Sequence, residues 1–136
     1  MQDKPTYDEL LGFIEKFLDE EIVPNVAGSR GFHARVAANA LRIVGREMAA
    51  REGALAAEWD GLDRLLETEE RPEGSAALAE AIHARNAELC ERIRGGEADP
   101  GAYHDEVFAH VRRTVAEKLR VSDPGLLERS QVPGTA

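Results

Sequence analysis

Four histidines are present, and one stands at a spacing that metal sites use. Glu80 and His83 form a Glu-x-x-His pair, which carboxylate-bridged di-iron bundles carry twice, together with two further carboxylates aimed into the core. Here the pair occurs once, and both side chains fall on the polar side of the predicted helix. His104 and His110 are six residues apart, so on a helix they point in different directions. The sequence therefore predicts no metal site.

Three polar side chains are predicted to lie within the apolar faces of helices: His33, Asn86 and His104. An imidazole in such a place could act as a base in a pocket or titrate near neutral pH. Alternatively, it could be a core residue that donates a hydrogen bond to a backbone carbonyl or a carboxylate. A buried amide must be hydrogen-bonded, so Asn86 is expected to bond to a neighbouring helix. No nucleophile lies nearby in the sequence, which favours core residues over a pocket.

A stripe of hydrogen-bond donors, Arg35, Asn39, Arg42 and Arg46, lies along one face of the segment 29–51. These donors could hold a phosphate or carboxylate of a ligand, or the acidic surface of a partner. The alternative is a set of salt bridges within the chain. Residues 1–28 contain seven acidic and two basic side chains, whereas residues 29–51 contain five arginines and one glutamate. This contrast favours the salt bridges.

The chain has no recognisable catalytic set. It contains no His-Glu-x-x-His run, no glycine-rich phosphate loop and no Gly-x-Ser-x-Gly elbow. Cys90 is predicted near the end of a helix beside Glu88 and Glu91, where the local field disfavours a thiolate. We therefore expect no enzyme activity and no cofactor, with an enzyme that uses His33 and an unrecognised carboxylate as the alternative.

Length and composition fit one small acidic domain. The chain has 136 residues and a formal net charge of −9, which disfavours nucleic-acid binding through the general surface. A single cysteine excludes an internal disulfide and fits a reducing compartment. We find no secretory signal and no apolar run of the roughly 18 residues that a membrane span needs. These features predict a cytoplasmic protein that does not enter a membrane.

Ala, Leu, Glu and Arg dominate the sequence, which indicates an all-α fold. Thr6 and Glu9 form a capping box at the start of the first helix, and Gly53 leaves open whether residues 30–68 form one kinked helix or two. The predicted helices cover residues 7–23, 30–51, 54–68, 75–95 and 102–120. We expect a bundle domain over residues 1–121 and a flexible tail over residues 122–136.

The segment 30–51 is apolar or small over most of its circumference, which is typical of a helix with neighbours on several sides. We therefore predict a single-domain antiparallel bundle of four to five helices around this central helix, with Phe32, Val36, Ile43 and Val44 enclosed. A stripe of small residues should allow one neighbour to approach closely: Ala34, Ala38, Gly45 and Ala49. The last helix is expected to bury Tyr103, Val107, Phe108, Val111, Val115 and Leu119.

Several short stretches resemble a family of small uncharacterised bacterial proteins. They are Pro5-Thr6 with Glu9-Leu10-Leu11, the run from Phe32 to Leu41, Asn86 to Cys90 with Arg92 to Gly95, and Thr114-Val115 with Lys118-Leu119. The resemblance spans about residues 2–121. Members of the family tend to accompany aminoglycoside-phosphotransferase-like kinases and acyl-CoA dehydrogenases. The resemblance thus implies an accessory role in acyl-CoA or related catabolism. The family has no established catalytic residues that could be assigned to positions of this chain.

Two functions from different classes follow. The first is a non-enzymatic accessory protein that binds a partner protein, with the kinase or the dehydrogenase as the implied partner. The alternative is a small-molecule module that holds an anionic, CoA-like or nucleotide-like ligand, with His33 and Asn86 in the pocket and the arginine stripe on the anion. A homodimer formed through an apolar helix face is compatible with both.

Overall fold

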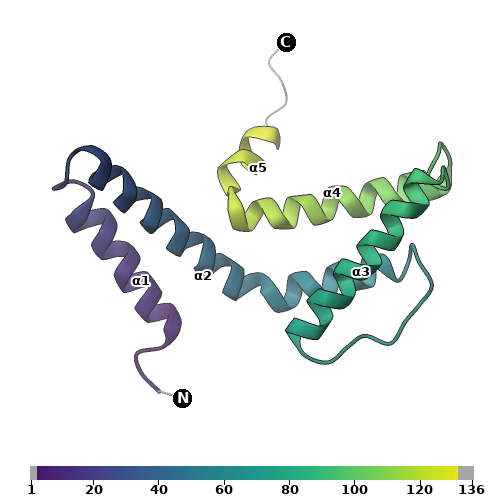
Figure 1. Cartoon of the computed structure of the whole chain (residues 1–136), viewed down its shortest axis with the longest axis horizontal. Coiled ribbons are helices and arrows are strands. Elements are labelled where there is room, and N and C mark those ends of the chain that lie inside the picture. The colour runs from purple at the N-terminus through teal and green to yellow at the C-terminus, as the bar shows by residue number, and fades with distance from the viewer. Residues whose placement is uncertain (1–2, 132–136) are drawn as a thin grey trace, which may run out of the picture. The chain divides into compact units, whose positions relative to one another are not determined.

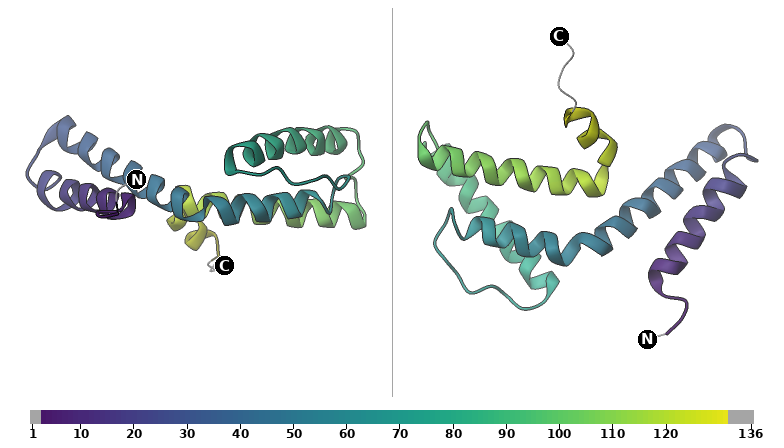
Figure 2. Two further views of the ribbon diagram at one scale, coloured as in Figure 1. Left: turned by 90° about the horizontal axis from the view of Figure 1, so that it is seen from below. Right: turned by 180° about the vertical axis from the view of Figure 1, so that it is seen from behind.

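The computed structural model describes residues 3–131 and contains helices without strands over that range. The elements are α1 (Tyr7–Phe17), a π-helical turn η1 (Leu18–Ile22), α2 (Gly28–Leu62), α3 (Ser75–Arg94), α4 (Ala102–Ser122) and α5 (Pro124–Gln131), as drawn in Figures 1 and 2. The predicted all-α fold is confirmed. The chain divides into two compact units, Met1–Ala49 and Ala50–Ala136, and α2 contributes to both.

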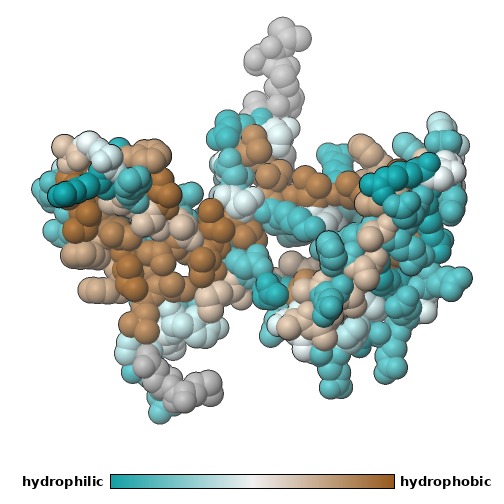
Figure 3. All heavy atoms as spheres, viewed as in Figure 1, coloured by the Kyte–Doolittle hydropathy of each residue, from teal (hydrophilic) through white to brown (hydrophobic). Residues whose placement is uncertain are grey.

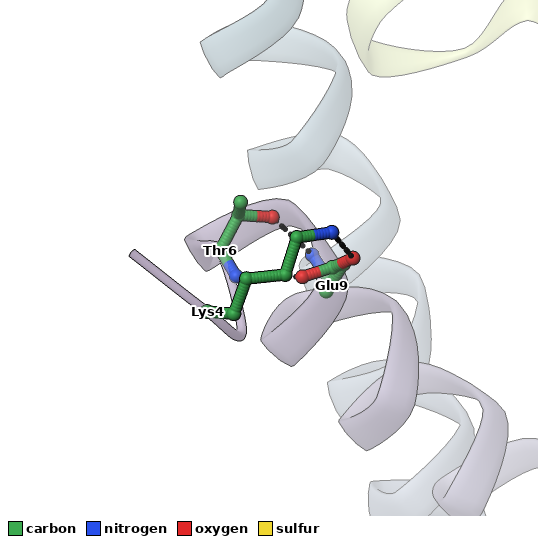
Figure 4. A network of polar contacts seen from close by, with 3 residues as sticks. All are labelled: Lys4, Thr6 and Glu9. Atoms are coloured by element: carbon green, nitrogen blue, oxygen red, sulfur yellow. Dashed lines mark hydrogen bonds and ion pairs between the residues drawn. The ribbon is translucent and has the colours of Figure 1, made fainter. Parts of the chain in front are cut away.

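Helix α1 begins at the predicted capping box, which Figure 4 shows. The Glu9 amide donates to Thr6 Oγ1 at 3.3 Å, and the Thr6 amide donates to Glu9 Oε2 at 2.7 Å. Lys4 Nζ lies 3.3 Å from the other Glu9 oxygen. The hydrogen bond from the Thr6 backbone and the one from Lys4 lower the pKa of Glu9. Two backbone donors at the helix start are thus satisfied by side chains.

Helix α2 is continuous through Gly53, so the glycine does not divide this segment into two helices. A glycine inside a helix costs about 1 kcal/mol relative to alanine, and strong helix formers on both sides offset that cost. The helix ends at Leu62 rather than at residue 68 as predicted. Leu65 and Leu66 are still buried, but they lie in the turn that follows.

In the first unit, α1 runs beside the first half of α2 as a helical hairpin (Figures 1 and 2). The side chains that α2 buries here are small: Ala34 is 8% exposed and Ala38 is fully buried. Gly31 is also buried, and a Cβ on it would lie 2.0 Å from the carbonyl oxygen of Val26. The predicted small-residue stripe is therefore packed at Ala34 and Ala38, whereas Ala49 is exposed and a Cβ on Gly45 would meet nothing within 4 Å.

The predicted enclosure of the segment 30–51 is wrong. Phe32 is 57% exposed, Val36 51% and Val44 44%, while Ile43 is half-buried. Within the described part of the first unit, α1 and η1 are the neighbours of this half of α2, and they cover its small-residue side. A broad apolar arc predicts several neighbouring helices. In the described part of the first unit, this half of α2 has one neighbour, the segment formed by α1 and η1.

The second unit has a true core. It is formed by side chains from the end of α2, the following turn, α3 and α4: Trp59, Leu62, Leu65, Leu66, Leu78, Ile82, Leu89 and Val107. Trp59 and Leu62 are its largest fully buried members. Helix α3 starts at Ser75, after Gly74 adopts a φ of 82°, and ends at Arg94, close to the predicted limits.

Helix α4 buries only part of the predicted set, and Leu119 is half-buried. Val107 and His110 are buried and Tyr103 is half-buried, whereas Phe108, Val111 and Val115 are exposed. Both sets follow helical spacing, so periodicity alone cannot choose between them. The choice is made by the fit of His110 against Gly61 of α2, described below.

A short helix lies within the segment 122–136, for which a flexible tail was predicted. Pro124–Gln131 forms helix α5, which Asp123 starts by accepting a hydrogen bond from the Leu126 amide at 3.0 Å. Proline fits the first turn of a helix, where its missing N–H has no intrahelical partner. Residues 132–136 lie outside the described range.

A buried arginine, Arg85, connects separate segments of the second unit. Arg85 of α3 is 3% exposed, and its guanidinium lies 4.4 Å from the centre of the Trp59 ring. It donates to Asp63 Oδ1 and, at 2.8 Å, to the carbonyl oxygen of Glu67. Its Nε has no hydrogen-bond partner. Arg85 thus joins α3 to the last turn of α2 and to the chain that follows it.

Arg85→Ala should lower the free energy of unfolding by about 3 kcal/mol, because it leaves a cavity beside Trp59 and removes the partners of Asp63 and Glu67. The measurement is urea unfolding followed by circular dichroism. Arg94→Ala is the matched control: the Arg94–Glu91 pair on the same helix is 69% and 73% exposed, so its loss should change stability by less than about 0.5 kcal/mol. Equal effects of the two variants would contradict the assignment.

Candidate functional site

The arginine stripe is partly occupied by ion pairs within the hairpin. Arg42 Nη2 lies 2.7 Å from Glu15 Oε1 and also bonds to Asp19 Oδ2. The hydrogen bond that Arg42 donates to Glu15 raises the pKa of Arg42, against the opposing effect of burial. These contacts are the salt bridges that the charge contrast favoured. Arg42 therefore connects α2 to α1 and η1.

The other donors of the stripe do not form one site. Arg35 and Asn39 are exposed on α2, and Arg46 is half-buried with polar contacts of its own. A shallow groove of about 300 Å³ includes Arg42 and Arg46, but Asp8 and Glu15 line it as well. Carboxylates on the same wall compensate the arginine charge, so this groove is a poor anion site.

The three candidate pocket residues belong to different surroundings. His33 is exposed on α2 in the first unit, with its ring 5.8 Å from that of Phe32. His104 is exposed on α4 in the second unit, where Nδ1 lies 2.9 Å from the Ala98 carbonyl oxygen and the ring stacks on Phe108. The prediction that both imidazoles point into apolar packing is wrong, because those faces of α2 and α4 are exposed. The hydrogen bond of His104 to a backbone carbonyl was expected.

Asn86 forms the expected interhelical hydrogen bond. Its Nδ2 donates to Glu58 Oε1 of α2 at 2.8 Å. The same oxygen lies 3.4 Å from Lys118 Nζ of α4, and the Glu58 side chain is only 11% exposed. Glu58 thus links three helices, and Asn86 acts in packing.

A groove that the sequence did not reveal lies beside His110. It has a volume of about 450 Å³ and is lined by Gly61, Arg64, Leu65, Glu106, Ala109, His110 and Arg113. His110 is 4% exposed, and its Nδ1 lies 3.4 Å from Arg113 Nη2. A guanidinium can only donate, so Nδ1 accepts and the proton sits on Nε2. Burial lowers the pKa of His110, as do Arg113, Arg64 and Lys118, while Glu58 opposes them, so the ring is neutral at pH 7.

Gly61 makes room for this imidazole. A Cβ at position 61 would lie 2.3 Å from His110 Nδ1 and 2.7 Å from Arg113 Nη2. The glycine lies inside α2, where its helix propensity is unfavourable. Its place is therefore explained by the close approach of α4 and not by the needs of α2.

Arg85 and His110 were not singled out as buried residues in the sequence analysis, although the sequence contains a weak signal for both. Arg85 follows Leu78 and Ile82 and precedes Leu89 at spacings of four, three and four, and His110 stands at the same spacings after Tyr103 and Val107. These are the spacings of a buried helical seam. A polar residue at such a position is either a packing contact or a site.

The polar groups of this groove come from Arg64, Arg113, His110 and Glu106. Its lining provides two guanidinium groups, a neutral imidazole and one carboxylate, without a serine, threonine or cysteine as nucleophile. Within residues 3–131, no three His, Cys, Asp or Glu side chains are grouped for a metal ion. Cys90 is a free, exposed thiol on α3. None of the helices described has the length and apolar character that crossing a membrane requires.

Gly61→Ala should lower the free energy of unfolding by about 1–2 kcal/mol, because the methyl group collides with the buried His110 ring. Gly53→Ala is the matched control in the same helix, since nothing lies within 4 Å of a Cβ there. It should raise stability by up to about 1 kcal/mol through helix propensity. Chemical denaturation of both variants measures the difference, and a stabilised Gly61→Ala protein would refute the close contact.

Comparison with known proteins identifies the family. No curated protein matches the chain, and no solved structure matches it either. The model of one family, described as a domain of unknown function (DUF6285), matches residues 24–126. The match includes all of α2, α3 and α4, whereas α1 lies before it. The chain therefore belongs to the DUF6285 family.

Proposed function

We propose that this chain is a non-enzymatic accessory protein that binds a partner protein through an exposed apolar stripe on α4. The stripe consists of Phe108, Val111 and Val115, of which Phe108 is the most exposed at 60%. These residues are spaced by three and four, so they follow one line along the helix. Leu126 of α5, which contacts α4, adds a further exposed apolar side chain.

The orientation of α4 is the observation that carries this proposal. The side that faces the core contains Val107, His110 and Thr114, whereas Phe108, Val111 and Val115 face outward. A helix that served only its own unit would be expected to bury the phenylalanine and the valines. An exposed line of apolar residues at this spacing suits a helix or a groove of another protein.

The family resemblance described in the sequence analysis suggests which protein the partner is. An aminoglycoside-phosphotransferase-like kinase or an acyl-CoA dehydrogenase is the protein that this chain would accompany. The stripe lies within the residues matched by the family model. Binding through it requires no catalytic residue of this chain, which agrees with the absence of a nucleophile from the lining of the His110 groove.

The test is co-expression and affinity purification of the full chain with each of the two implied partners. The triple variant Phe108→Ala, Val111→Ala, Val115→Ala should weaken binding at least tenfold, because truncating two or three central apolar contacts costs more than about 1.4 kcal/mol. Asp105→Ala, also exposed on α4, is the control and should bind as the wild type does. Failure of both partners to bind the wild type, or unchanged binding by the triple variant, would refute the proposal.

A second candidate function is the binding of a small anion in the His110 groove. Arg64 and Arg113 are exposed at its edge, and the neutral His110 ring lies at its wall. Thermal-shift assays with acyl-CoAs and nucleotides test this alternative. Stabilisation that Arg64→Ala and Arg113→Ala abolish, but Arg71→Ala preserves, would support it. An unchanged melting temperature at millimolar ligand would count against it.

A further inference from the structure

The helical hairpin of the first unit exposes a large apolar surface, which we name the hairpin face. It consists of Tyr7, Leu10, Phe13, Ile14 and Phe17 of α1 and Phe32, Val36, Val44 and Met48 of α2. Phe13 is 71% exposed. Figure 3 shows apolar side chains gathered over α1 and the first half of α2.

These residues form one apolar arc on each helix of the hairpin. At 100° per residue, the members from α1 fall within an arc of roughly 120° and those from α2 within roughly 160°. The ion pairs of Arg42 with Glu15 and Asp19 mark the opposite side. The hairpin is therefore amphipathic as a unit, with a polar edge and an apolar face.

The size of the hairpin face matches that of a stable interface. If each member contributes about half of a ~150–200 Å² side-chain surface, the face amounts to roughly 700–900 Å² per copy, close to the ~800 Å² per partner of a standard interface. It exceeds the roughly 300–600 Å² of the largest apolar patch on a typical monomer. Two antiparallel helices enclose no core by themselves, whereas two such pairs form a four-helix bundle.

The charges of the hairpin indicate which partner fits. The chain up to residue 28 is acidic, with seven acidic and two basic side chains, and residues 29–51 are basic, with five arginines and one glutamate. Glu20 and Glu21 are exposed on η1, and Arg30 and Arg35 are exposed on α2. In a twofold pairing, the acidic arm of one copy can lie against the basic arm of the other, and the same contact occurs twice.

We propose that a second copy of this chain covers the hairpin face, so that two hairpins form an intermolecular four-helix bundle with each α1 against α2 of the other copy. Each copy supplies both the apolar face and the opposite charge that the other requires. The inference is independent of the α4 stripe, which belongs to the second unit.

The first test is the solution mass of the full chain by sedimentation equilibrium between about 1 and 100 μM. The expected species has twice the chain mass of 14.9 kDa. Phe13→Asp should raise the dissociation constant at least 100-fold while the helical circular dichroism is retained, because it places a charge in the apolar interface. Phe108→Asp on the α4 stripe is the matched control and should leave the dimer intact. A monomeric wild type at 100 μM, or a dimeric Phe13→Asp variant, would overturn the proposal.

A charge exchange tests the arrangement of the two copies. Glu20→Lys with Glu21→Lys makes the acidic arm more basic, and Arg30→Glu with Arg35→Glu makes the basic arm more acidic. Each double variant alone should dimerise at least tenfold more weakly than the wild type, since the substitutions remove most of the net charge of one arm and with it the attraction between the arms, and an equimolar mixture should form a mixed dimer. Double variants that dimerise as the wild type does would exclude the pairing of α1 with α2 of the other copy.

Discussion

The second unit depends on the guanidinium of Arg85. It lies over the Trp59 ring, donates to Asp63 Oδ1 and donates a second hydrogen bond to the carbonyl oxygen of Glu67. Removing a charge from water is costly unless the protein supplies partners for it. The contacts of Arg85 meet most of that requirement, and they all come from the end of α2 and the turn after it. The path of the chain after Leu62 is therefore set by a side chain of α3.

The position of α4 follows from the same region of α2. Gly61 stands two residues before Asp63, and only a glycine leaves room for the His110 ring. Tyr103 at the start of α4 donates to the Leu65 carbonyl oxygen at 3.0 Å, which fixes the other end of the contact. These two contacts select the side of α4 that faces the core. As a consequence, the apolar line through Phe108, Val111 and Val115 faces outward.

The first unit is built on a different principle. In this unit α2 buries small side chains, Ala34 and Ala38, whereas its larger apolar side chains Phe32, Val36 and Val44 are exposed. The ion pairs of Arg42 hold the polar edge together. This division leaves one unit with a buried core and the other with an amphipathic surface. The two exposed apolar surfaces, one on each unit, support the proposals that the chain binds a partner protein and a second copy of itself.

The sequence by itself determined the features that depend on neighbouring residues. The all-α fold, the capping box at Thr6 and Glu9, and the limits of α3 were predictable because helix propensity, capping and glycine stops act within a few residues. The bond between Asn86 and Glu58 was predictable in kind, since a buried amide needs a partner, although the partner was not.

Only the tertiary structure decided which apolar face of each helix is covered. The outward side of α4, the exposure of Phe32, Val36 and Val44, and the burial of Arg85 and His110 depend on contacts between distant segments. A helix with two apolar lines has no local preference between them. The shape of the neighbouring helix determines which line is buried. For α4, the space left by Gly61 of α2 admits His110 and so determines the buried side.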